Sequence, residues 1–183
     1  MLRIFKTYHF NLQNTAVKAK TISFSARPGD LESKDDYYVL SSNLVIFESS
    51  FSNYNDVLYG KIKSKALPTW IRVNLANKMA ENAFDWTNVF SLNNGGTHNN
   101  QWCIVDYKKY WEFANKKEKE AWNDVVWLIE QFFDIIEKED VTQKYLLKNG
   151  YFATYNLPYF QSIFDSGNYK EKNPSDPRKD IFE

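Results

Sequence analysis

A turn-forming loop that runs directly into an apolar strand lies near the centre of this chain, at Asn93–Asp106. The loop part, Asn-Asn-Gly-Gly-Thr-His-Asn-Asn, holds two glycines and four asparagines, and Gln-Trp-Cys-Ile-Val-Asp follows it. Glycine readily takes a positive φ, and asparagine tolerates the same region. Amide side chains presented at the end of such a strand can hold a polar ligand or a developing oxyanion. The alternative interpretation is an ordinary polar loop before a strand.

Three strands are predicted in the first third of the chain. Lys18–Ser25 alternates apolar residues with serines, as a half-buried strand does. Tyr37–Ser41 and Leu44–Ser49 follow, and Ser42-Asn43 between them fits a tight hairpin. The dipeptides of Arg27-Pro28-Gly29-Asp30 predict a turn.

Helices are predicted to alternate with strands over the middle of the chain. Pro68 fits the first turn of a helix over Thr69–Ala80, in which apolar residues recur at spacings of four. These apolar residues are Ile71, Leu75 and Met79. The elements that follow are a short helix at Asp85–Leu92 capped by Asp85, a strand at Trp102–Val105 and a helix that begins within Tyr107–Phe113.

The charge balance and the hydropathy each argue against one class of protein. The 23 basic and 23 acidic residues give a formal net charge of zero, whereas a nucleic-acid-binding protein normally has a basic excess. No apolar run approaches the length that spans a bilayer, so no transmembrane segment is predicted. With 43% hydrophobic and 25% charged residues, the chain has the composition of a soluble globular protein.

The sequence indicates no cofactor and no metal site. Its single cysteine, Cys103, excludes an internal disulfide framework and a cysteine-based zinc site. Because Cys103 lies in an apolar run, we interpret it as a small buried hydrophobe rather than a reactive nucleophile. The two histidines, His9 and His98, have no carboxylate or thiol at metal-ligand spacing.

Two further patterns have both a chemical and a structural interpretation. Asp35-Asp36 suggests the paired carboxylates of glycosidases. Neighbouring residues of a strand point to opposite faces, however, so we interpret the pair as a turn before the Tyr37 strand. The six tryptophans would suit a sugar- or lipid-binding surface, but at periodic positions an aromatic core is the expected role.

The Asn93–Asp106 segment resembles the Asn-Ser-Gly-Thr-Tyr-Asn-Asn-Gln-Trp motif of the phospholipase B-like (lamina ancestor) family. Further blocks occur in that family's order and at similar spacing, so the resemblance covers most of the chain. These blocks are Met1–Ile4, Ser23–Gly29, Asp35–Ser42, Leu58–Lys61, Trp70–Asn77, Gly150–Pro158 and Asp176–Phe182.

The resemblance implies that the chain is part of an N-terminal-nucleophile hydrolase. In this family the nucleophile is a cysteine that becomes the first residue of the mature catalytic chain. That cysteine would lie just upstream of the segment matching Met1, which itself offers only a thioether without an ionisable proton. The implied acyl-enzyme would therefore form on a cysteine absent from this chain. Family members also continue past the segment that matches Asp180-Ile181-Phe182.

Asn99 and Asn100 are the candidate catalytic residues that the resemblance implies. One of the two would line the active site, where its side-chain amide would stabilise a tetrahedral oxyanion, and we favour Asn100. His98 stands where the family usually has tyrosine. A histidine there could titrate near neutral pH, although a lone histidine is more often an ordinary surface or hydrogen-bonded residue.

The predicted fold class is α+β. By resemblance it is a partial αββα sandwich of antiparallel sheets like that of N-terminal-nucleophile hydrolases, with residues 1–183 forming a single partial domain. The chain would supply part of each sheet, which leaves strand edges exposed and one apolar face uncovered. An upstream segment of the same precursor is therefore an expected partner.

The Ala121–Glu139 segment supports two different predictions. Its apolar residues form an amphipathic-helix stripe of Trp122, Val125, Val126, Ile129, Phe132, Phe133 and Ile136. The family resemblance instead places a strand, a turn and a strand here, and β-branched residues are concentrated in the first half. We adopt the second prediction. Lys116–Glu120, just before it, is expected to be a solvated surface segment.

Two functions from different classes follow from these observations. The first is a fragment of a phospholipase B-like hydrolase that acts on ester or amide bonds of a lipid or an acylated small molecule. The second is a catalytically inactive relic or binding protein that retains part of the fold. The resemblance implies a lysosomal or secreted protein. No signal peptide is visible, because Leu2–Thr7 carries charges where a leader needs an apolar region.

Overall fold

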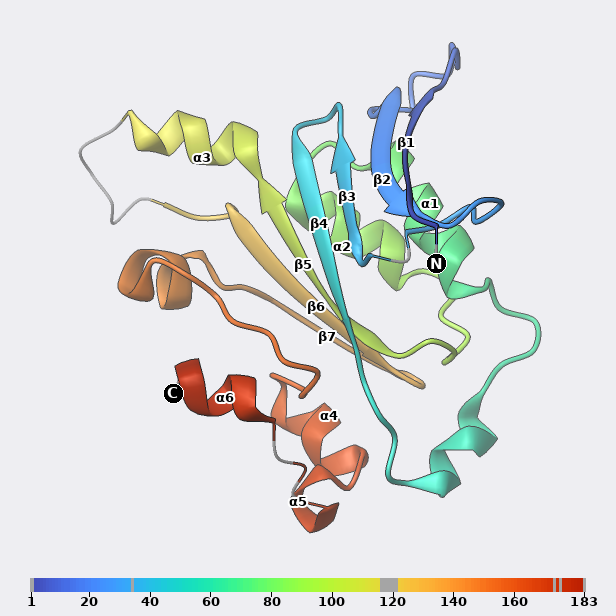
Figure 1. The fold of residues 1–183 in the computed structure, drawn as a ribbon, viewed down its shortest axis with the longest axis vertical. Coiled ribbons are helices and arrows are strands. Elements are labelled where there is room, and N and C mark those ends of the chain that lie inside the picture. Colours follow the sequence, from blue (N-terminus) through green and yellow to red (C-terminus); the bar gives the residue numbers. More distant parts are fainter. Residues whose placement is uncertain (1, 34, 116–121, 173, 175, 183) are drawn as a thin grey trace.

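The computed structural model of this chain describes residues 2–33, 35–115, 122–172, 174 and 176–182. Within them, seven strands form one antiparallel sheet whose order follows the chain (Figure 1). The strands are β1 (Ile4–His9), β2 (Thr21–Ala26), β3 (Tyr37–Leu40), β4 (Leu44–Ser50), β5 (Asn100–Asp106), β6 (Val126–Phe132) and β7 (Ile135–Asp140).

The α+β class and the antiparallel pairing agree with the prediction, but the strands are not divided between two sheets. We expected the chain to supply part of each sheet of a sandwich, whereas all strands in the described residues belong to one sheet. The helical elements are η1 (Asp56–Lys61), α1 (Thr69–Met79), α2 (Ala83–Ser91), α3 (Tyr107–Ala114), the π-helical η3 (Thr142–Leu147), α4 (Gln161–Ser166), α5 (Tyr169–Lys172) and α6 (Pro177–Phe182).

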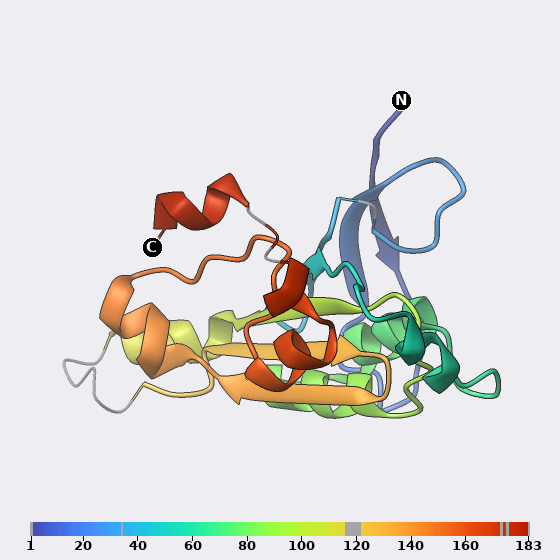
Figure 2. The ribbon, with the colours of Figure 1, turned by 90° about the horizontal axis from the view of Figure 1, so that it is seen from below.

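Figure 2 shows the sheet between two layers, with α1 and α2 on one face and the C-terminal segments on the other. Under the two helices the strands alternate as predicted, and β2 buries every second residue. Trp86 of α2 is fully buried and its ring centroid lies 5.5 Å from that of Trp102 on β5. This aromatic contact joins the helical layer to the middle of the sheet.

On the opposite face, a buried carboxylate anchors the C-terminal segments to the sheet. Glu130 of β6 is fully buried and accepts hydrogen bonds from the backbone N–H groups of Tyr159 at 2.6 Å and Phe160 at 3.1 Å. It also accepts from Gln101 Nε2 at 2.6 Å. With this cover, β6 is buried on both faces over most of its length.

The same face is open over β3 and β4, which agrees with the expected uncovered apolar surface. Val39 and Phe47 are each 44% exposed there. A groove of about 1020 Å³ runs beside Phe47 and reaches Cys103 and Trp111. At the edge of the sheet, β1 is exposed along nearly its whole length.

Both predicted hairpins are present. Between β3 and β4, Asn43 has φ 61° and its N–H donates to Leu40 O at 3.0 Å. For the Ala121–Glu139 segment, the prediction of a strand, a turn and a strand is confirmed. The strands are β6 and β7, and the chain turns between them at Phe133, which has φ 52°. The amphipathic-helix alternative for this segment is wrong, because its apolar residues serve both buried faces of a strand rather than one stripe of a helix.

The predicted helix at Thr69–Ala80 is present as α1, but its buried face differs from the predicted one. Leu75 and Met79 are 39% and 41% exposed. The buried residues of α1 are Thr69, Arg72, Val73, Ala76 and Asn77. Apolar spacing alone therefore selected the wrong side of the helix, because polar residues with internal partners occupy the buried side.

The cap of α2 also differs from the prediction. The side chain of Asn82 accepts from the N–H of Asp85 at 2.8 Å, so Asn82 is the N-cap and Asp85 belongs to the first turn. The helix after β5 is present as α3, capped by Asp106. Lys116–Glu120, the expected surface segment, lies outside the described residues. No helix in the part of the chain that the structure describes meets the length and apolarity needed to cross a membrane.

Candidate functional site

The loop between α2 and β5 takes the backbone conformations that its composition predicts. Asn93, Gly96 and His98 have φ values of 53°, 77° and 51°. A Cβ atom on Gly96 would lie only 3.1 Å from the Cα atom of Phe133. Glycine is therefore needed at this position both for its φ and because the β6–β7 turn approaches so closely.

Arg72 of α1 organises this loop from the protein interior, where it is only 1% exposed. Its Nε donates to Leu92 O at 2.9 Å, and Nη1 donates to Asn94 Oδ1 at 3.3 Å. The guanidinium also donates to Phe90 O and to Gln131 Oε1. These four acceptors are neutral oxygens, and burial lowers the pKa of Arg72 to about 10. One buried cation thus ties the end of α2, the loop and β6 together.

Asn99, one of the two predicted catalytic residues, holds the β6–β7 turn. Its Oδ1 accepts from the N–H of Phe133 at 2.8 Å and from Gln131 Nε2 at 3.4 Å. Gln131 Nε2 also donates to Thr97 O at 2.9 Å. The Asn99 side chain is therefore engaged as a hydrogen-bond acceptor within the protein.

Asn100, the favoured residue, is fully buried at the start of β5 on the face that α1 and α2 cover. Its Oδ1 accepts from the indole N–H of Trp102 at 2.9 Å, and its Nδ2 donates to Glu48 Oε1 at 2.9 Å. An indole nitrogen can only donate, so the two ends of the amide cannot exchange places without losing this bond. The Asn100 N–H₂ group is consequently directed toward the Glu48 carboxyl.

Glu48 is the titratable centre of this site. Burial raises the pKa of its carboxyl to about 7, hydrogen bonds from Ser50 and Asn100 lower the pKa, and the nearby Asp36 carboxylate raises it. Ser50 Oγ donates to Glu48 Oε1 at 2.8 Å. A carboxyl with this pKa exchanges a proton near neutral pH.

A small cavity of about 60 Å³ lies against this carboxyl. It is lined by Glu48, Ser50, Thr69, His98 and Trp102 among others. Its volume accommodates a water molecule or a carbonyl oxygen, and not an acyl chain. The site therefore offers a protonatable carboxyl beside a space for one polar atom, and the Asn100 amide is hydrogen-bonded to that carboxyl.

The other residues singled out in the sequence have different surroundings. Asp35 forms an ion pair with Arg3 at 2.7 Å, and Asp36 has φ 60° in the bend before β3, so the turn interpretation agrees with the structure. His9 Nδ1 lies 3.0 Å from Thr21 Oγ1 on the exposed edge strands. In the described part of the chain, no group of three or more metal-ligating side chains was found.

Cys103 packs within the apolar cluster on the second face of the sheet and is half-buried. Burial raises the pKa of its thiol to about 12. At neutral pH the thiol is protonated, and the thiolate is the form that attacks a carbonyl. The interpretation of Cys103 as a small hydrophobe therefore agrees with the structure.

Sequence reasoning missed Glu48, Arg72 and Gln131, which build the surroundings of the asparagines. Glu48 and Arg72 each have a signal that could have been noticed. Glu48 stands at a core-facing position of the alternating β4 strand, two residues after Ile46. Arg72 is a charge among the inward-facing residues of α1. A charge on a buried face requires a partner, and so marks a network.

Comparison with known proteins places these residues in a family. The family model described as Phospholipase B matches residues 1–176. Phospholipase B-like protein B of Dictyostelium discoideum is 38% identical over 173 residues, which are 94% of this chain and 29% of that protein. Phospholipase B-like 1 of Rattus norvegicus is 36% identical over 169 residues, 92% of this chain and 30% of the relative.

Phospholipase B-like 1 of Homo sapiens gives a similar result, with 34% identity over 169 residues. That alignment covers 92% of this chain and 29% of the human protein. The chain thus spans about three tenths of the length of the relatives it matches. With a family model that covers nearly every residue, the chain belongs to the phospholipase B family.

Proposed function

We propose that this chain forms part of a phospholipase B-like hydrolase that cleaves ester or amide bonds of lipid-type substrates. The family to which the chain belongs supports a hydrolase-type function. In the proposed reaction the nucleophile is a cysteine outside residues 1–183, which forms an acyl-enzyme that water then hydrolyses. Cys103 does not serve as this nucleophile, because burial raises its pKa to about 12.

The observation that carries the proposal is the fixed orientation of the Asn100 amide. Trp102 holds its oxygen and Glu48 accepts one hydrogen of its Nδ2. Glu48 takes one hydrogen of the Nδ2 group, and the second hydrogen is the one that we propose serves a ligand. In the proposed role this hydrogen stabilises the oxyanion of a tetrahedral intermediate.

Asn99 then has a positioning role rather than a catalytic one. Its oxygen accepts from Phe133 N–H, which fixes the turn between β6 and β7. Gln131 contacts Asn99 and, on the neighbouring strand, is the register partner of Asn100. The choice between the two asparagines therefore falls on Asn100.

The substrate's acyl chain would bind outside the small cavity at Glu48, which has room for only a polar atom. We further propose that an upstream segment of the same precursor covers the open apolar face around Val39 and Phe47. Such a segment would bury the apolar area that is exposed on this face, opposite the face that holds Glu48 and Asn100. The lysosomal or secreted location that the family resemblance implies remains part of this proposal.

The test compares asparagine variants in the native polypeptide that carries this chain. Hydrolysis of p-nitrophenyl octanoate and of octanoyl p-nitroanilide distinguishes ester from amide cleavage. Asn100→Ala is expected to lower kcat by roughly 10²–10³-fold with little change in KM, as for the loss of one oxyanion donor. Asn123→Ala, at an exposed asparagine, is the matched control and should retain wild-type kcat.

A folded Asn100→Ala variant with wild-type kcat would overturn the catalytic role of Asn100. If the native polypeptide hydrolyses neither substrate, the alternative function, an inactive relic or binding protein, takes the place of the proposal.

A further inference from the structure

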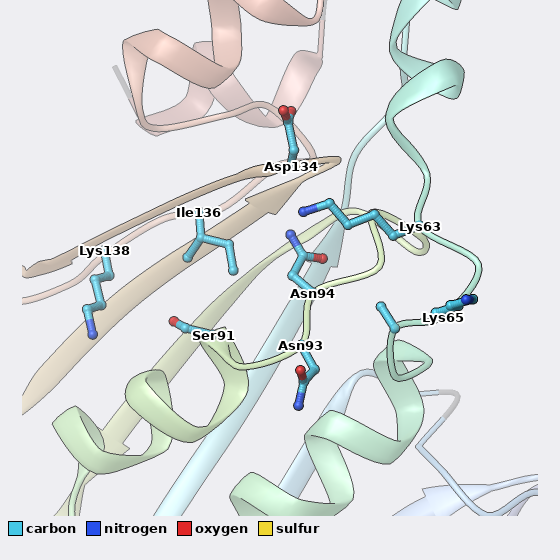
Figure 3. A pocket seen from close by; sticks show the side chains of 9 residues that line it. Lys63, Lys65, Ser91, Asn93, Asn94, Asp134, Ile136 and Lys138 are labelled. Carbon is cyan, nitrogen blue, oxygen red and sulfur yellow. The ribbon is translucent and has the colours of Figure 1, made fainter.

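A second, more open pocket lies on the other side of the Asn93–Asn100 loop. It has a volume of about 760 Å³ and opens between the loop after η1, the end of α2 and β7. Figure 3 shows Lys63 reaching across this opening toward Asn94, with Ile136 and Lys138 along β7. No residue of the Glu48–Asn100 site lines the pocket.

The pocket has an excess of positive charge. Three lysines from two separate segments line it, Lys63 and Lys65 from the loop and Lys138 from β7. The single acidic residue in its lining, Asp134, is already paired with Lys61 at 3.0 Å. The three lining lysines are therefore not balanced by the carboxylate beside them.

Lys138 supports this assignment by its surroundings. Its ammonium donates to Asn88 Oδ1 and lies 4.9 Å from the ring centroid of Phe84. Both partners are uncharged, and burial lowers the pKa of Lys138. A bound anion near this ammonium would offset the cost of holding the charge there.

A fourth positive charge lies behind the pocket wall. Asn94 lines the pocket, and its Oδ1 accepts from the buried Arg72 guanidinium at 3.3 Å. The hydrogen bonds described for Arg72 all go to neutral oxygens. A buried cation with low-dielectric surroundings adds to the positive potential at the Asn94 surface.

We propose that this pocket binds the phosphate group of an organic phosphate ester. Lys63, which reaches into the opening in Figure 3, is the residue placed to contact the phosphate, while Lys65 and Lys138 at the two ends of the pocket add to the positive potential. The pocket is much larger than a phosphate ion and lies in the range of small-molecule sites, so it has room for the esterified group. Ile136 offers that group an apolar contact.

The phosphate ester has two possible sources, a lipid headgroup and a soluble metabolite. The assignment does not depend on the proposed acyl transfer, because it uses different residues and predicts binding rather than turnover. The probes are glycerol 3-phosphate, followed by calorimetric titration at low salt, and phosphatidylcholine vesicles with or without phosphatidic acid, followed by flotation. Low salt is needed because exposed charges are screened within about 10 Å at 0.1 M.

The decisive variant of the full chain is Lys63→Gln/Lys65→Gln. Its matched control is Lys148→Gln/Lys170→Gln, which removes the same charge from exposed lysines that do not line the pocket. The pocket variant should bind the preferred probe roughly tenfold more weakly or worse, as for the loss of one charge-assisted hydrogen bond. The control should change the affinity less than about twofold.

Saturable binding of glycerol 3-phosphate that is lost only in the pocket variant supports a site for a soluble ester. Binding restricted to phosphatidic acid vesicles, and lost only in the pocket variant, supports a lipid headgroup as the source. The proposal is overturned if both double variants weaken binding equally, since the attraction is then non-specific, or if neither probe binds saturably.

Discussion

The indole N–H of Trp102 donates to Asn100 Oδ1 at 2.9 Å and thereby decides which end of the Asn100 amide meets Glu48. Both residues belong to β5 and lie two positions apart, so they share one face of the sheet. Their geometry is built into the strand rather than into a loop. This arrangement makes the strand itself the support of the proposed catalytic donor.

Replacing Trp102 tests this support. Trp102→Phe leaves the buried Asn100 oxygen without its donor, so the free energy of unfolding in urea should fall by about 1–3 kcal/mol. Trp111→Phe, at a 61% exposed tryptophan, is the control and should change it by less than about 0.5 kcal/mol. Equal losses in the two variants would contradict the assigned role of Trp102.

The stability of the fold should depend on pH through Glu48 and Glu130. Burial is the largest cause for both carboxyls and raises each pKa from 4.5 to about 7. Because the folded-state pKa is the higher one, protonation favours the folded state. The stabilisation is complete below about pH 4.5 and is lost as the pH rises through about 7.

Each carboxyl should contribute up to roughly 3 kcal/mol to this difference. Urea unfolding measured at pH 5 and at pH 8 should therefore give the larger free energy at pH 5. Glu48→Gln should reduce the difference, whereas Glu81→Gln, at a mostly exposed side chain, should leave it unchanged. A wild-type chain that is more stable at pH 8 would refute the assigned pKa shifts.

Arg72 should not be replaceable by lysine. The guanidinium serves acceptors on α2, the loop and β6 at once, and an ammonium cannot reach them all. Arg72→Lys is expected to lower the free energy of unfolding by about 3 kcal/mol, because buried acceptors lose their donors. The same change at the exposed Arg27 should have little effect. Thermal unfolding followed by circular dichroism compares the two, and similar melting temperatures would count against the network.

Alanine substitutions at Gly29 and Gly96 distinguish the cost of a strained backbone conformation from the cost of a steric clash. Gly96 and Gly29 both have positive φ, of 77° and 84°, but only Gly96 has neighbours near an added Cβ. Gly29→Ala should cost about 1 kcal/mol from its backbone conformation alone. Gly96→Ala should cost about 1–3 kcal/mol more, because Phe133 must shift. Equal costs in chemical denaturation would argue against a tight contact between the loop and the β6–β7 turn.

Local signals predicted the fold well where the alternation or the turn chemistry was unambiguous. Asn43 marked the β3–β4 hairpin, and β-branched residues marked β6 against a competing helical stripe. The apolar spacing of four did not identify the buried face of α1, because the inward face of this helix carries Arg72 and Asn77. Their buried positions follow from partners on other elements, Gln131 of β6 for Arg72 and Trp86 of α2 for Asn77, which the apolar spacing of one helix does not contain.

The candidate site was predicted only in part. The family resemblance pointed to Asn99 and Asn100, but their different surroundings depend on which face of the sheet each side chain reaches. Glu48 enters the site because β4 pairs with β5 in a register that sets it opposite Trp102. Such cross-strand neighbours are 54 positions apart in the sequence, and only the pairing brings them together.

The most direct test of the central claim is to trap the acyl-enzyme in the native polypeptide that carries this chain. The protein is incubated with p-nitrophenyl octanoate, quenched in acid and analysed by intact and peptide mass spectrometry. The predicted result is a species larger than 21.7 kDa, acylated at a cysteine outside residues 1–183, with Cys103 unmodified. Acylation of Cys103, or a native mass of 21.7 kDa with no acyl adduct, would contradict the account.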